Sequence, residues 1–215
     1  MVETTEETTR EPETTMIQII QPEETEPETE AYVSPIDFEA LWEVNPEVVG
    51  WLTVPGTRID YPILHTTDNE TYLHRSLEGE ETVAGSIFLD CEDEGDFSSL
   101  HNVIYGHHMK DGSMFKDVVR FKEQEYFNQH RDIIIYTPDR EIHLRTLAAL
   151  YVKAEPIRRK TSFRSEEGFA AYVEEMIQGA GVQAPPEGEI KKLYSLITCS
   201  YEFPDARTIL YAYEE

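Results

Sequence analysis

Two residues near the C-terminal end of the chain have the chemistry of a nucleophile and a stabilising cation. Cys199 stands in the run Thr198-Cys199-Ser200, and Arg207 follows eight positions later. A histidine, His107, ends an apolar run far upstream. Cysteine attacks as the thiolate, an imidazole stabilises that charge, and a guanidinium stabilises the oxyanion that the attack creates. These residue types predict nucleophilic cysteine chemistry on an acyl group.

The composition limits the number of domains and the kinds of partner. The chain has 215 residues, 40% of them hydrophobic. This is enough for one domain with a hydrophobic core, and too few for two domains of ordinary size. Its net charge is −25, from 43 acidic and 18 basic residues. Phosphates would be repelled by such a surface, so we expect no nucleic-acid partner and no direct binding to anionic lipid.

The two cysteines, Cys91 and Cys199, do not form a disulfide framework, and pairing them would consume the proposed nucleophile. We therefore expect two free thiols. A buried cysteine is often an inert small hydrophobe, and that interpretation suits Cys91, which stands among acidic residues expected to raise its pKa.

The N-terminal segment, 1–34, is rich in Glu, Thr and Pro and is predicted to be an acidic, disordered linker. The globular domain is predicted over 35–215. No run approaches the roughly 20 apolar residues of a membrane span, and no signal-peptide pattern opens the sequence. The tail is either native or the remainder of an anchored protein, and the sequence leaves both open.

The globular part is predicted to be mainly β. Short runs rich in β-branched residues are separated by Gly, Pro and Asp turns, which favours a closed or nearly closed barrel. Helical spacing of apolar residues predicts an N-terminal helix at 36–44, a helical stretch at 114–130 broken near Lys122, and a helix at 166–178. The predicted strands are 49–54, 59–64, 85–90, 102–107, 132–137, 142–152, 193–199 and 208–213.

Several of these segments together resemble a sortase of class B. The resemblance covers about 38–213, with the motifs in the same order and at compatible spacing. The motifs are WLTVPGTRIDYPI at 51–63, DNETYL at 68–73, GSIFLD at 85–90, YGH at 105–107, and LITC at 196–199 with Arg207.

The resemblance implies a fold and a set of catalytic roles. The fold would be an eight-stranded sortase-type β-barrel with an N-terminal helix and a helix in the connection between strands six and seven. Cys199 would attack the substrate carbonyl to form a thioester, and His107 would be the general acid and base. Arg207 would bind the oxyanion, together with the backbone N–H of a neighbouring residue. No cofactor and no metal are implied.

The resemblance also implies partners and a location. Asn69, Leu73, Thr198 and Ser200 would contact the substrate, the C-terminal sorting-signal peptide of a secreted protein. The acceptor would be an amine of a peptidoglycan precursor or of a pilin lysine. Family members carry an N-terminal membrane anchor, which would place the enzyme at the extracellular face of the membrane of a Gram-positive type of cell.

Alternatives accompany these predictions. His108 could replace His107, although neighbours on a strand face opposite sides, so only one can reach a shared cleft. The acidic loop at 90–96 could bind calcium but lacks the pattern of an EF-hand, and a solvated loop is the simpler interpretation. The same residues would also suffice for a cysteine endopeptidase. A non-catalytic surface binding module is the third hypothesis.

Overall fold

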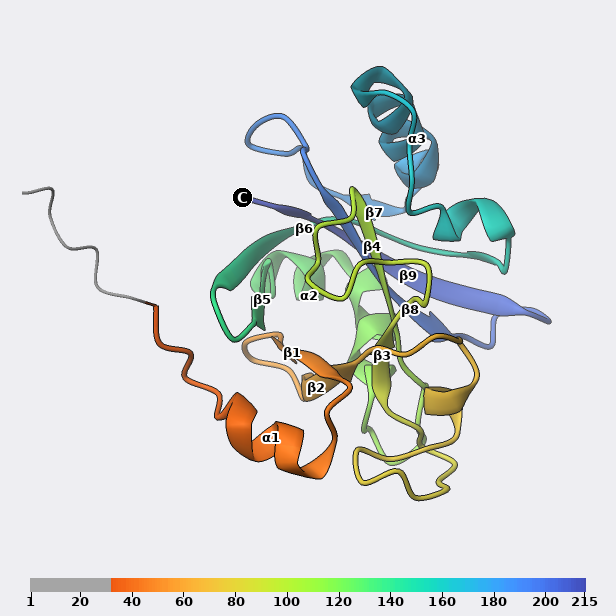
Figure 1. Ribbon diagram of the computed structural model, residues 1–215. Helices are drawn as coiled ribbons and strands as arrows, with labels where there is room; N and C mark the ends of the chain where they lie inside the picture. The colour runs from red at the N-terminus through yellow and green to blue at the C-terminus, as the bar shows by residue number, and fades with distance from the viewer. Residues whose placement is uncertain (1–31) are drawn as a thin grey trace, which may run out of the picture. The chain divides into compact units, whose positions relative to one another are not determined.

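Strands dominate the part of the chain that the computed structural model describes, residues 32–215 (Figure 1). The predicted linker lies outside these residues except for its last three, so its disorder stays a prediction. The strands are β1 (Val48–Thr53), β2 (Asp60–Leu64), β3 (Ile87–Leu89), β4 (His101–Tyr105), β5 (Asp132–Tyr136), β6 (Glu141–Lys153), β7 (Val182–Gln183), β8 (Leu193–Cys199) and β9 (Ala206–Glu214).

Eight of these strands close into a barrel. The order of hydrogen-bonded neighbours is β5-β1-β2-β3-β4-β8-β9-β6, and a further pairing of β5 with β6 joins the two ends. The predicted eight-stranded barrel is therefore confirmed. The ninth strand, β7, pairs only with β6. It was not predicted, because two residues carry no readable alternation.

The strands near the C-terminus are buried on both faces. Along β8, Leu196 belongs to the cluster that fills the barrel, whereas its neighbour Ile197 packs into a second cluster outside it. That outer cluster includes Phe169 and Tyr172 of helix α3. Since successive strand residues face opposite sides, the odd-numbered positions of β8 belong to the outer face. This face carries Cys199.

Helices and 3-10 turns occupy the connections. They are α1 (Phe38–Val44), η1 (Thr71–Leu73), η2 (Phe115–Lys122), α2 (Gln124–Gln129), η3 (Pro156–Arg159) and α3 (Glu166–Ile177). Figure 1 shows α1 and α3 far apart, on different sides of the strands. Side chains of Asp37 and Ser165 cap α1 and α3. The helix predicted at 114–130 divides at Glu123, and its first half is a 3-10 helix.

The apolar strand that leads to His107 is shorter than predicted. β4 ends at Tyr105 rather than at His107. At Gly106 a Cβ atom would lie 2.4 Å from Ile87 Cδ1 and 2.7 Å from the Phe115 ring, so only glycine fits. His107 and His108 therefore follow the strand, and strand alternation does not decide which of them faces a cleft.

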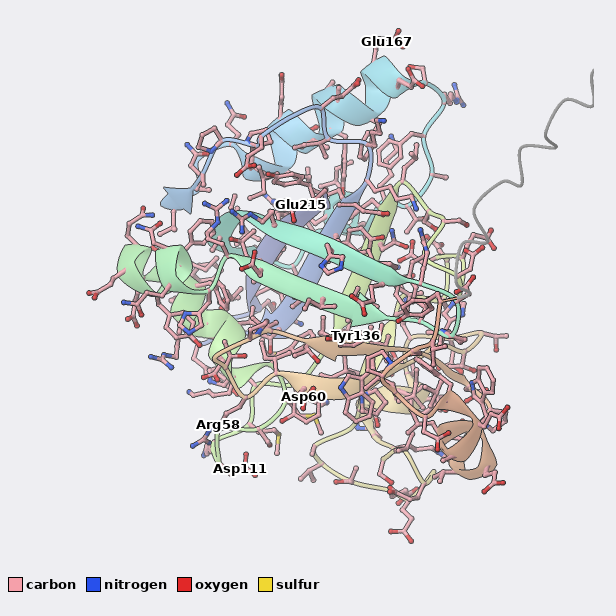
Figure 2. The ribbon with its side chains drawn as sticks, turned by 90° about the vertical axis from the view of Figure 1, so that its left-hand side faces the viewer. Arg58, Asp60, Asp111, Tyr136, Glu167 and Glu215 are labelled. Atoms are coloured by element: carbon pink, nitrogen blue, oxygen red, sulfur yellow. The ribbon has the colours of Figure 1, made fainter. Side chains whose placement is uncertain are left out.

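The segment after these histidines is attached to the turn between β1 and β2. Arg58 donates through Nη1 to the backbone carbonyl of Asp111 over 3.3 Å, and Figure 2 shows the two residues next to each other at one edge of the molecule. The backbone N–H of Arg58 also donates to Asp117 Oδ2 over 3.0 Å. This turn therefore supports the chain on both sides of Met114.

Candidate active site

Cys199 and Arg207 share one position in the pairing of β8 with β9. The register of this antiparallel pair places them opposite each other, at the end next to the hairpin loop. Residues directly opposite in such a pair project from the same face, with Cβ atoms about 4.5–5.5 Å apart. The thiol and the guanidinium thus leave the sheet side by side.

His107 reaches the same face from the parallel neighbour of β8. Tyr105 of β4 is in register with Ile197, and Gly106 N donates to Ile197 O over 3.2 Å. Two residues further along each chain lie His107 and Cys199. His107 Nε2 is 2.8 Å from the carbonyl oxygen of Leu73. A carbonyl only accepts, so Nε2 carries the proton and donates it, which leaves Nδ1 as the free acceptor.

A cavity of about 300 Å³ brings six of the seven predicted site residues together. They are Asn69, Leu73, His107, Thr198, Cys199 and Arg207. Ser200 is the exception, since it is 5% exposed and lies outside the lining. His108 does not line the cavity either. The catalytic and substrate-binding roles of these residues stay predictions.

The segment 68–73 has a second task besides lining the cavity. Asp68 Oδ1 accepts from the backbone N–H of Glu70 and of Thr71 over 2.8 and 2.7 Å, and these bonds lower the pKa of its carboxyl. Asn69 Oδ1 accepts from Cys91 N over 2.9 Å. These bonds order the short helix η1, whose last residue, Leu73, binds His107. The segment therefore orients the histidine as well as forming a wall.

A second cavity, of about 420 Å³, continues from the first. The two share Tyr105, Ala154, Arg159, Ile197 and Arg207. The remaining lining comes mostly from the connection between β6 and α3, and includes Lys153, Glu155, Pro156, Arg158 and Ile209. The sequence analysis did not identify these residues as part of a site. The available signal was the consecutive basic residues 158–160 in a strongly acidic chain.

A buried carboxylate lies behind two residues that line both cavities, Tyr105 and Arg159. Asp90 is fully buried and accepts a hydrogen bond from Tyr105 Oη over 2.6 Å. Arg159 Nε lies 4.0 Å from the same carboxylate oxygen. Burial, together with the negative charge of Asp90, raises the pKa of Tyr105, so its hydroxyl stays a donor. Tyr105 is thereby held against Asp90, and the half-exposed Arg159 lies beside them.

Side chains of the acidic loop accept hydrogen bonds from nearby backbone N–H groups. Asp93 Oδ2 accepts from Val103 N over 2.7 Å, and Asp96 Oδ1 accepts from Ser98 N over 2.9 Å. Burial raises the pKa of Asp93 to about 7. Within residues 32–215, no group of three or more His, Cys, Asp or Glu side chains is arranged to hold a metal ion.

The second cysteine is separate from the paired residues. Cys91 and Cys199 are both free thiols, as predicted. Burial, followed by the charges of Asp90 and Glu92, raises the pKa of Cys91. A raised pKa leaves less thiolate at neutral pH, so Cys91 is the less suitable nucleophile by its surroundings.

Comparisons with known proteins point in one direction. No protein-family model matches the sequence. The chain is 43% identical over 94 residues to sortase B of Listeria monocytogenes, covering 44% of this chain but only 38% of that protein. It is 26% identical over 163 residues to sortase B of Staphylococcus aureus, covering 75% of this chain and 67% of the relative. The X-ray structure of Clostridium perfringens sortase B is similar with a TM-score of 0.78 and 28% identity, covering 83% of this chain and all of that one.

Proposed function

We propose that this chain, which is similar to class B sortases, is a cysteine transpeptidase acting on the C-terminal sorting-signal peptide of secreted proteins. The observation that carries the proposal is the pairing of Cys199 with Arg207 in one register position, on a cavity that His107 also lines. A nucleophile, an oxyanion donor and a proton carrier are the three groups that acyl transfer needs.

In the first half-reaction, the Cys199 thiolate attacks a peptide carbonyl of the sorting signal. The carbonyl electrons move to oxygen, and the guanidinium of Arg207 donates hydrogen bonds to this oxyanion. When the oxyanion collapses, the amide C–N bond breaks and the protonated imidazole of His107 gives its proton to the leaving amine. The products are a thioester on Cys199 and the released C-terminal remainder.

In the second half-reaction, an acceptor amine attacks the thioester. His107, now neutral, removes a proton from the amine, a new amide bond forms, and Cys199 leaves as the thiolate. A peptidoglycan precursor or a pilin lysine would supply the amine. Attack by water instead would make the protein an endopeptidase that releases the free acid.

Arg207 is the proposed hydrogen-bond donor to the oxyanion. The Ser200 backbone N–H, the nearest amide after the nucleophile, donates to Ala206 O over 3.0 Å. It is therefore engaged within the hairpin rather than directed at a substrate oxygen. Arg207 Nη1 donates to the same Ala206 carbonyl over 3.1 Å, and the remaining N–H groups of its guanidinium would bind the oxyanion in the cavity that Arg207 and Cys199 both line.

The place of action is proposed from the family. Sorting signals and wall precursors meet at the extracellular face of the membrane, so we place the enzyme at the cell surface. Across residues 32–215, the structure contains no helix of sufficient length and apolarity to span a membrane.

The test is a set of peptide cleavage assays with two matched variants. Fluorogenic peptides carrying different sorting motifs are incubated with the protein, with Cys199→Ala and with Cys91→Ala, with and without amines such as oligoglycine or diaminopimelate-containing stems. We expect cleavage and amine-ligated product from the unaltered protein and from Cys91→Ala, and none from Cys199→Ala. Equal cleavage by Cys199→Ala would exclude the proposal. Free acid as the only product, with every amine, would favour the endopeptidase.

A further inference from the structure

His108 lies behind the nucleophile, outside the cavity, and binds its backbone. Its Nδ1 is 3.0 Å from the carbonyl oxygen of Cys199. Its Nε2 is 2.6 Å from the ammonium nitrogen of Lys116 on η2. One face of the ring packs on Tyr201, with 5.1 Å between the ring centroids. The imidazole therefore connects the strand end that carries Cys199 to a neighbouring element.

This side chain completes the hydrogen-bonding ladder between β4 and β8. In a parallel pair, bonds from one strand recur every second residue. Gly106 N donates to Ile197 O, so the next bond would run from the backbone of residue 108 to Cys199 O. The chain has left the strand by then, and the His108 ring supplies the hydrogen bond to that carbonyl instead.

The two contacts together define the protonation of the ring. An ammonium group only donates, so Lys116 requires Nε2 to be an acceptor. The proton then lies on Nδ1, where it is donated to the Cys199 carbonyl. Burial lowers the pKa of His108, and Lys116 and Lys122 act in the same direction, whereas the hydrogen bond to the Cys199 carbonyl and the charge of Glu202 oppose them. Both contacts fit a neutral ring in the tautomer with Nδ1 protonated.

Lys116 is itself held in place by the fold. Its neighbour Asp117 accepts from Arg58 N over 3.0 Å, and Met114 N donates to Tyr61 Oη over 3.0 Å. Met114 also forms a β-bridge with His108, and Phe115 N donates to His107 O over 2.9 Å. The support of the imidazole therefore extends to β2 and to the β1–β2 turn.

We propose that His108 is a positioning residue that holds the Cys199 peptide in the orientation needed for attack, through a hydrogen bond whose tautomer Lys116 selects. The inference rests on the proposed role of Cys199 as the nucleophile. His108 would not touch the substrate. Its loss would let the end of β8 rotate, and so would misalign Cys199 with Arg207 and His107 while leaving the groove intact.

The test compares His108→Asn with His108→Gln. The side-chain nitrogen of asparagine stands where Nδ1 stands in histidine and can donate to the Cys199 carbonyl, whereas that of glutamine matches Nε2 and points at Lys116. We expect His108→Gln to lower kcat for peptide cleavage about tenfold, the size of a lost hydrogen bond to a buried carbonyl, with KM unchanged. His108→Asn should retain kcat within about threefold. Equal kcat in the two variants, or a change in KM alone, would overturn the proposal.

Two measurements that need no turnover separate this inference from the proposed function. The first is the ¹⁵N NMR spectrum of the His108 ring in the full chain, where we expect a neutral imidazole protonated at Nδ1, and a shift toward the Nε2-protonated form in Lys116→Met. The second is the rate of iodoacetamide alkylation of Cys199 in the Cys91→Ala background, which should change in His108→Gln and not in His108→Asn. If no form of the protein cleaves any peptide, these two results still show whether His108 positions Cys199.

An Nε2-protonated or charged ring in the unaltered protein would overturn the proposal. Urea unfolding of each variant confirms that it is folded.

Discussion

Cys199 and Arg207 stand opposite each other across β8 and β9, one position before the hairpin loop begins. The register of this antiparallel pair places them on the same face, and both strands are buried along most of their length. A shift of one residue would turn one of the two side chains into the barrel. The register of β8 and β9 therefore determines that Cys199 and Arg207 share one face.

Replacing Arg207 tests the oxyanion contact directly. We expect Arg207→Ala to lower kcat by roughly two to three orders of magnitude, as removal of one oxyanion donor does in other acyl-transfer enzymes. Arg207→Lys should recover part of the loss, because it keeps the charge without the planar fork of donors. Steady-state cleavage assays give both values. Arg164→Ala, at an exposed position before α3, is the control, and an equal loss there would contradict the interpretation.

Two glycines with similar backbone angles test the support of His107. Gly85 and Gly79 have φ of +58° and +79°, a region that costs other residues about 1 kcal/mol or more. A Cβ at Gly85 would lie 2.7 Å from the carbonyl oxygen of Leu73, which binds His107, whereas nothing lies within 4 Å at Gly79. We expect both alanine variants to lose stability in urea unfolding, and only Gly85→Ala to lose kcat. Unaltered kcat in Gly85→Ala would show that the Leu73 contact is dispensable.

The buried Asp93 predicts a pH dependence of stability. Its pKa rises to about 7 in the folded chain, chiefly through burial, and is about 4 when unfolded. The folded state therefore binds the proton more tightly, so stability should fall as the pH rises from about 4 to about 7, by at most about 1.4 kcal/mol per pH unit. Asp93→Asn keeps an oxygen acceptor for the Val103 amide and should remove this contribution. Urea unfolding of both proteins at several pH values measures it, and parallel pH profiles would contradict the assignment.

The bond between Tyr105 and Asp90 should contribute to stability. Tyr105→Phe removes the donor and leaves a buried carboxylate oxygen with a poorer set of partners, at a cost of about 1–3 kcal/mol. Tyr151 is 52% exposed, so Tyr151→Phe is the matched control and should cost almost nothing. Chemical denaturation gives both values. Equal stability of the two variants would mean that Arg159 compensates for the lost hydroxyl.

Much of the fold could be predicted from local pattern. Runs rich in β-branched residues between turn residues predict strands at 193–199 and 132–137, which the structure has at Leu193–Cys199 and Asp132–Tyr136. The spacing of Phe169, Tyr172, Val173 and Met176 predicts α3, where all four are buried. The wrong strand end, in contrast, depends on packing. β4 ends at Tyr105, and Gly106 then fits between Ile87 and Phe115. Nothing in the sequence around Gly106 indicates this contact.

For the candidate site too, the sequence predicts some features and not others. The types of Cys199, His107 and Arg207 predict the chemistry, because only a few side chains can be nucleophile, proton carrier and oxyanion donor. The burial of Ser200 was not predictable, and the basic run at 158–160 does not by itself indicate the second cavity beside Arg159, since both depend on how the connection after β6 and the hairpin after β8 pack.

The sequence alone determines which residues can do chemistry here and which segments become strands, because both follow from side-chain type and short-range periodicity. Only the tertiary structure decides that Leu73 orients His107 and that His108 supports Cys199. Those contacts join residues 34 and 91 positions apart. Closure of the barrel brings such distant segments together, and no local propensity encodes their final distance.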